Sequence, residues 1–137
     1  MWFQYWNFVN GKTCRSFKSI YVTKAEEALT TAIESSKNKR YNSAVINAVH
    51  SGINSLDALT TKFKGKRGTD DHTEALSLVK GILQAPEYDE IRKQFVSLIN
   101  MKNISEYQPD LMNEKDDNEA IKWAERILSK INAKLNP

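Results

Sequence analysis

The sequence predicts an all-α protein built as an antiparallel up-and-down bundle of about four or five helices. Apolar residues recur at three- and four-residue steps through most of the chain, which is the spacing of a helix with one buried face. The 137 residues include only five glycines and three prolines, so few sheet turns can form. A composition of 40% hydrophobic and 27% charged residues is that of a globular protein with its own core. We therefore expect one helical domain over residues 23–137.

Residues 1–22 form a separate aromatic N-terminal segment. It lacks the basic start, the apolar run and the small-residue cleavage site of a secretion signal, and it is too short to cross a bilayer. We expect it to pack on the bundle or across a subunit interface, with contact to a membrane surface as the alternative. The single cysteine cannot form an internal disulfide, and no Cys/His spacing of a zinc site is present. These features predict a cytoplasmic protein that uses no metal or other cofactor.

The first helix is predicted from Thr23 to about Lys37. Thr23 and Glu26 have the spacing of a capping box, in which each side chain satisfies a backbone N–H at the helix start. Polar residues around Asn38 predict a turn, and a second helix of about 22 residues then reaches Gly65. The apolar positions of the second helix are Ala44, Val45, Ala48, Val49, Gly52, Ile53, Leu56, Leu59 and Phe63.

Asp71 and Glu74 predict the start of a third helix, as its N-cap and capping-box partner, with His72 in the first turn. Pro86 favours the start of a fourth helix, because its fixed φ suits the first turn. Residues 103–117 are mostly polar and predict a long connection, after which regularly spaced apolar residues from position 120 predict the last helix.

The loop between the second and third helices carries the candidate catalytic pair, Arg67 and His72. Arginine presents a fixed cationic fork that matches phosphate, and histidine exchanges a proton near neutral pH. The pair can therefore bind and cleave a phosphodiester, which makes RNA the first substrate to consider. Lys64 and Lys66 precede the pair and are candidate substrate-binding residues. The alternative is that Arg67 is a solvated loop cation and His72 a structural residue at a helix start.

Charge is unevenly distributed, because residues 1–68 hold eleven basic and four acidic residues. This half is the candidate surface for a polyanion, although a net charge of +3 also fits an ordinary solvated surface. A helix of about 22 residues is about 33 Å long and separates the basic turn at residues 37–40 from the one at 62–67. In an antiparallel bundle the chain after the fourth helix returns to the Arg67 end. We therefore expect Lys102, Asn103 and Tyr107 to join the substrate-binding residues there.

Two segments carry a resemblance to a known family. Residues 40–59, RYNSAVINAVHSGINSLDAL, followed by a glycine loop and Asp71-His72, resemble the central helical hairpin of the HEPN family. The tail is similar as well, in Tyr107-Gln108-Pro109-Asp110 and, after an acidic stretch, in NEAIKWAERIL at residues 118–128. The resemblance covers roughly residues 23–135, and it supports the fold more strongly than the activity, because one fold hosts many functions.

HEPN domains are antiparallel helical bundles, commonly homodimeric, and many are metal-independent endoribonucleases with an Arg and a His at the spacing of Arg67 and His72. The resemblance implies that Arg67 holds the scissile phosphate, while His72 takes the ribose 2′-hydroxyl proton or donates to the leaving oxygen. Gly68 departs from the polar residue that usually follows the Arg, and Asp70 and Asp71 would repel a phosphate.

Two functions of different classes follow from the resemblance. The first is an RNA-cleaving protein, such as a toxin with an antitoxin partner or a defence or stress nuclease, with Arg67 and His72 as its chemistry. The second is a non-catalytic module that binds a nucleotide or docks onto a partner such as a nucleotidyltransferase. Both predict a homodimer without membrane association.

Overall fold

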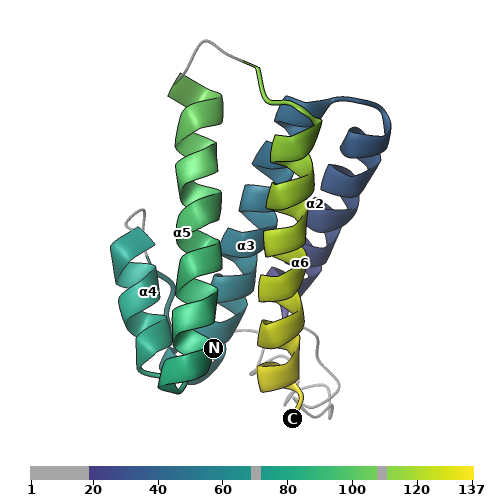
Figure 1. Ribbon diagram of the computed structural model, residues 1–137. Coiled ribbons are helices and arrows are strands. Elements are labelled where there is room, and N and C mark those ends of the chain that lie inside the picture. Colours follow the sequence, from purple (N-terminus) through teal and green to yellow (C-terminus); the bar gives the residue numbers. More distant parts are fainter. Residues whose placement is uncertain (1–18, 69–71, 108–110) are drawn as a thin grey trace, which may run out of the picture.

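The computed structural model describes residues 19–68, 72–107 and 111–137, and within these ranges it has five helices and no strand. In chain order the helices are α2 (Ile20–Lys37), α3 (Tyr41–Lys64), α4 (His72–Lys80), α5 (Ala85–Tyr107) and α6 (Glu114–Leu135). Figure 1 shows α2, α3, α5 and α6 side by side as long helices, with the shorter α4 beside the lower half of α5. The all-α bundle predicted from the sequence is confirmed.

Helix α3 is the centre of the bundle and packs against all four other helices. Small residues let its neighbours approach closely. The Ser51 hydroxyl donates a 2.8 Å hydrogen bond to the Ala25 carbonyl of α2. A Cβ at Gly52 would lie 2.8 Å from Cδ1 of Leu98 on α5, so a larger residue there would displace the end of the Leu98 side chain. The largest fully buried side chains are Phe95, Leu56, Leu59, Ile91, Leu98, Ile127 and Ile131.

The start of α2 differs from the sequence prediction. Ser19 is the N-cap, and its hydroxyl accepts a 3.2 Å hydrogen bond from the Tyr21 N–H. Thr23 lies inside the helix, with its N–H bonded to the Ser19 carbonyl at 3.1 Å, so the predicted capping box at Thr23 is wrong. The helix extends toward the N-terminus because Val22 is buried in the core, which rewards the extra turn.

The predicted connection over residues 103–117 is also wrong for most of its length. Helix α5 continues to Tyr107, and α6 begins at Glu114. A capping box starts α6: the Asn113 side chain accepts a 2.9 Å hydrogen bond from the Asp116 N–H, and the Asp116 carboxylate accepts a 3.0 Å bond from the Asn113 N–H. Most polar residues of the helical parts of this stretch lie on exposed or half-exposed faces, whereas the Asp117 side chain is buried. Helix faces rich in exposed polar residues have the composition of a loop.

Three contacts fix the direction of α5. Lys130 of α6 donates a 2.6 Å hydrogen bond to Glu90 near the start of α5. The Lys62 ammonium donates a 2.7 Å bond to the last helical carbonyl of α6, that of residue 135. At the other end of the bundle, the N–H of Met112, just after α5, donates a 2.8 Å bond to the Asn42 side chain. Helix α5 therefore starts at the C-terminal end of α3 and runs toward its N-terminal end (Figure 1).

No helix among the described residues has both the length and the apolar character needed to cross a membrane.

Candidate functional site

Arg67 is fixed by contacts that the sequence does not reveal. Helix α3 ends at Lys64, and the C-cap Gly65, with a left-handed φ of 71°, turns the chain. The Arg67 Nε then lies 3.3 Å from Oδ2 of Asp57 on α3, and the guanidinium carbon lies 5.4 Å from the centroid of the Tyr21 ring on α2. The Arg67 side chain remains 55% exposed, whereas that of Asp57 is 6% exposed. A guanidinium has five N–H donors, so the contacts with Asp57 and Tyr21 still leave donors for an anion from solvent.

A second cation lies beside Arg67. The Lys24 ammonium is 5.6 Å from the centroid of the same Tyr21 ring, and Lys24 is exposed on α2. We call Tyr21, Lys24, Asp57 and Arg67 the Arg67 cluster. It combines two cations with one buried carboxylate, so an excess of positive charge faces solvent. Tyr21, Lys24 and Asp57 were not predicted from the sequence, although an Asp between the buried Leu56 and Ala58 does signal a paired charge.

Burial and pairing act against each other on the Asp57 carboxyl. Burial raises the pKa of Asp57 above its ordinary value, and the Arg67 guanidinium, with a smaller contribution from Lys24, offsets part of that rise. In return, the Asp57 carboxylate raises the pKa of Arg67, which stays charged. The asymmetry follows from position, because the carboxylate is buried and the guanidinium is largely in water.

His72 lies in the first turn of α4, as predicted, but its contacts differ from those of Arg67. The His72 ring packs edge-on against Phe95 of α5, with 5.8 Å between the ring centroids and 71° between the planes. Arg67 contacts α2 and α3, so the two members of the candidate pair have partners on different helices. Asp70 and the predicted N-cap Asp71 lie outside the described residues.

The position after Arg67 has room only for glycine. Gly68 is buried, and a Cβ at this position would lie 2.7 Å from Cα and Cβ of Ala75 and 2.8 Å from its N. The loop backbone therefore rests directly on α4, the helix that carries His72. Any larger residue at position 68 must separate the Arg67 loop from α4.

The candidate substrate-binding residues divide between the two ends of the bundle. Lys64 and Lys66 are exposed at the C-terminal end of α3, near Arg67 in the chain. Lys102, Asn103 and Tyr107 lie at the opposite end, because α5 runs away from Arg67. The predicted placement of these three beside Arg67 is wrong, since α4 has only nine residues and does not carry the chain back along the bundle.

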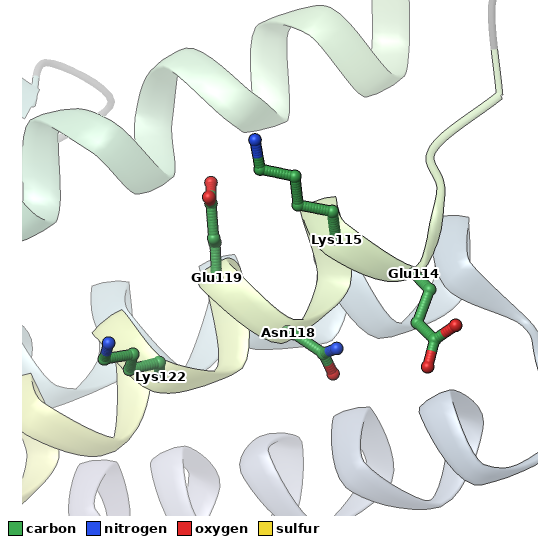
Figure 2. A pocket seen from close by; sticks show the side chains of 5 residues that line it. All are labelled: Glu114, Lys115, Asn118, Glu119 and Lys122. Carbon is green, nitrogen blue, oxygen red and sulfur yellow. The ribbon is translucent and has the colours of Figure 1, made fainter.

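The lysine at that opposite end already has an acidic partner. The Lys102 ammonium pairs with Glu106 at 3.4 Å, and Tyr107 is 76% exposed. The first turns of α6 line a shallow hollow of about 480 Å³, formed by Glu114, Lys115, Asn118, Glu119 and Lys122. Figure 2 shows Lys115 and Glu119 pointing toward α5, while Glu114 and Asn118 point to the other side of α6. Two acidic and two basic side chains balance, so this hollow has no excess charge for a polyanion.

The HEPN domain family model matches residues 19–134, from the N-cap of α2 to the last turn of α6. The chain belongs to the HEPN domain family. HEPN proteins are known for ribonuclease and nucleotide-binding roles, and the match includes every residue of the Arg67 cluster. No significant match to a curated protein or to a solved structure was found.

Proposed function

We propose that this HEPN chain is a metal-independent endoribonuclease in which Arg67 holds the scissile phosphate of RNA. The observation that carries the proposal is the Arg67 cluster, in which a half-exposed guanidinium is oriented by the buried Asp57 and the Tyr21 ring. An oriented guanidinium loses less side-chain entropy on binding phosphate than a free loop arginine does. Lys24 supplies a second cation, so pairing with Asp57 does not neutralise the surface.

The chemistry needs only a phosphate-binding cation and a proton carrier. The ribose 2′-oxygen attacks phosphorus, the bond from phosphorus to the 5′-oxygen breaks, and a 2′,3′-cyclic phosphate and a 5′-hydroxyl are formed. His72 takes the 2′-hydroxyl proton or gives a proton to the leaving 5′-oxygen, while Arg67 offsets the charge that develops on the phosphoryl oxygens. No oxidant or metal enters this balance.

The separate partners of Arg67 and His72 lead us to a composite site. A second copy of the chain, related by a two-fold axis, brings Arg67 of one copy and His72 of the other to one phosphate. The half-exposed guanidinium is available for such an arrangement, and His72 is only half-buried.

A second candidate is a non-catalytic module that binds nucleotide phosphates or a partner protein such as an antitoxin or a nucleotidyltransferase. The contact between His72 and Phe95 favours it, because an imidazole packed edge-on against a core ring serves a structural purpose. In this case Arg67 binds an anion and no bond is cleaved.

The deciding experiment is cleavage of single-stranded RNA in excess EDTA by the native chain, Arg67→Ala and His72→Ala. The control is Lys37→Gln, which removes an exposed cation at the far end of α2. We expect cleavage with a cyclic-phosphate product by the native chain and the control alone. Equal cleavage by native and His72→Ala chains, or none by either, refutes the nuclease. Retained binding without cleavage supports the second candidate.

Mixing the two inactive variants tests the composite site. A dimer that joins an Arg67→Ala chain to a His72→Ala chain retains one intact Arg67 and one intact His72 on different copies. If the site is composite, the mixture regains part of the native activity after the subunits exchange. If the mixture stays inactive although mixed dimers form, both residues must come from one chain.

A further inference from the structure

We infer that a hollow at the C-terminal end of α3 is a second phosphate subsite, which binds a backbone phosphate of RNA next to the one held by Arg67. This inference rests on the proposed function. The hollow has a volume of about 210 Å³ and is lined by Phe63, Lys64, Gly81, Ile82 and Lys134. No acidic residue is among these lining residues, in contrast to the balanced hollow on α6.

The Lys64 ammonium lies against Gly81. A Cβ at Gly81 would lie 3.1 Å from the Lys64 Nζ and 3.3 Å from its Cε, so the lysine lies across the turn between α4 and α5. Lys134 approaches the same hollow from the last turn of α6. Within the part of the chain that the structure describes, neither ammonium forms an ion pair. Two unpaired cations from different helices therefore face one small space.

Lys62 lies in the same last turn of α3 as Lys64, but it already has a hydrogen-bond partner. Its ammonium donates a 2.7 Å hydrogen bond to the Leu135 carbonyl and lies 5.6 Å from the centroid of the Phe63 ring. This lysine joins the ends of α3 and α6, and it leaves Lys64 and Lys134 as the cations available to a ligand. The Phe63 ring is 44% exposed and offers a face or edge to a ribose or base.

The size of the hollow and its position near Arg67 indicate which ligand it binds. Pockets for drug-sized molecules have volumes of about 300–1,000 Å³, so this hollow suits a phosphate with part of its ribose. Lys64 and Arg67 are three residues apart, which limits the distance between their Cα atoms to about 11 Å. One RNA strand of a few nucleotides can therefore contact both. Lysines in the last turn of a helix also complement the helix dipole, and the test must separate that role from binding.

The test measures binding of a fluorescent single-stranded 2′-O-methyl RNA, which cannot be cleaved, at several salt concentrations. We compare the native chain with Lys64→Gln, Lys134→Gln and Gly81→Ala, and use Lys37→Gln as the control. Each lost phosphate contact reduces the steepness of log affinity against log salt by about 0.7. With equal affinities at about 1 M salt, this corresponds to about an eightfold loss of affinity at about 0.05 M salt. We expect this loss for both lysine variants, and weaker binding without a change of net charge for Gly81→Ala.

Other outcomes overturn the inference in distinguishable ways. If both lysine variants bind as the native chain does while Arg67→Ala binds weakly, the hollow is no subsite, although the proposed function stands. A loss of unfolding free energy in Lys134→Gln with native RNA binding assigns the lysine to the helix end alone. If the native chain binds no RNA, the proposed function fails. NMR titration with inorganic phosphate then tests whether the hollow binds a free anion. Amide shifts of Gly81 and Ile82 that vanish in Lys134→Gln support such a site, and unshifted amides exclude it.

Discussion

Replacement of Gly68 by alanine tests whether the Arg67 loop is held directly against α4. A Cβ at this position lies 2.7 Å from Cα of Ala75 and 2.8 Å from its backbone N. Carbon atoms prefer separations of about 3.5–4.0 Å, so the loop and α4 must move apart by about 1 Å. Overpacking of this kind costs about 1–3 kcal/mol. We expect a loss of about 3 kcal/mol in unfolding free energy, because the atoms in the way include helix backbone.

Two other glycines provide matched controls in the same urea unfolding series, followed by circular dichroism. Gly65 has a φ of 71° and no neighbour within 4 Å of its Cβ position, so Gly65→Ala costs about 1 kcal/mol from backbone conformation alone. In Gly52→Ala the new methyl meets the end of a side chain, Cδ1 of Leu98, at 2.8 Å. A gain of about 1 kcal/mol in helix propensity offsets much of that cost.

Two results would contradict a backbone contact between Gly68 and α4. Ala75→Gly removes one of the three close atoms and leaves the backbone contacts at 2.7 and 2.8 Å, so it cannot rescue Gly68→Ala. If the double variant is as stable as Ala75→Gly alone, or if Gly68→Ala costs no more than Gly65→Ala, the backbone contact is not what requires glycine. Gly68→Ala should also weaken RNA binding, since a displaced loop breaks the 3.3 Å contact between Arg67 and Asp57.

Three further predictions concern the Arg67 cluster and α6. Burial raises the pKa of Asp57 above 3.8, so the folded state binds this proton more tightly than the unfolded state does. The unfolding free energy of the native chain relative to Asp57→Asn should therefore fall as pH rises above about 4, and parallel pH profiles would contradict this. Tyr21→Leu should weaken RNA binding about two- to fivefold because Arg67 loses both the ring and the hydroxyl of Tyr21, whereas Tyr21→Phe keeps the ring and should weaken binding less; equal effects exclude a role for the ring. Asn113→Ala should cost about 1 kcal/mol in unfolding experiments and Asn113→Ser much less, unless the capping box contributes nothing.

The sequence was sufficient to predict the bundle because the core follows helical spacing. Leu56 and Leu59 of α3 and Ile127 and Ile131 of α6 repeat at three or four residues, and all four are fully buried. Helix ends were predicted less well. The pattern at Thr23 is only four residues long and also occurs inside helices, so it could not outweigh the packing that extends α2.

The site was predicted only in part. Spacing alone pointed to Arg67 and His72 as candidates, since both lie in one short stretch of chain, and their roles stay a prediction. The contact of Arg67 with Asp57 and Tyr21 depends on a loop that folds back over α3 and on the packing of α2, which no local pattern encodes. The length of α4 decided where α5 starts and hence on which end Tyr107 lies, and a short helix has too few apolar positions to fix its length from sequence.

The brevity of α4 also bears on its motion. Only Ala75 and Val79 of this helix are buried, against twelve buried residues in α3. Segments with few buried contacts open at a lower free energy than the rest of a fold, and their amides exchange hydrogen early. Helix α4 should therefore detach transiently while α2, α3 and α6 stay protected. Because His72 is its first residue, the imidazole would leave Phe95 in each such excursion without any global unfolding.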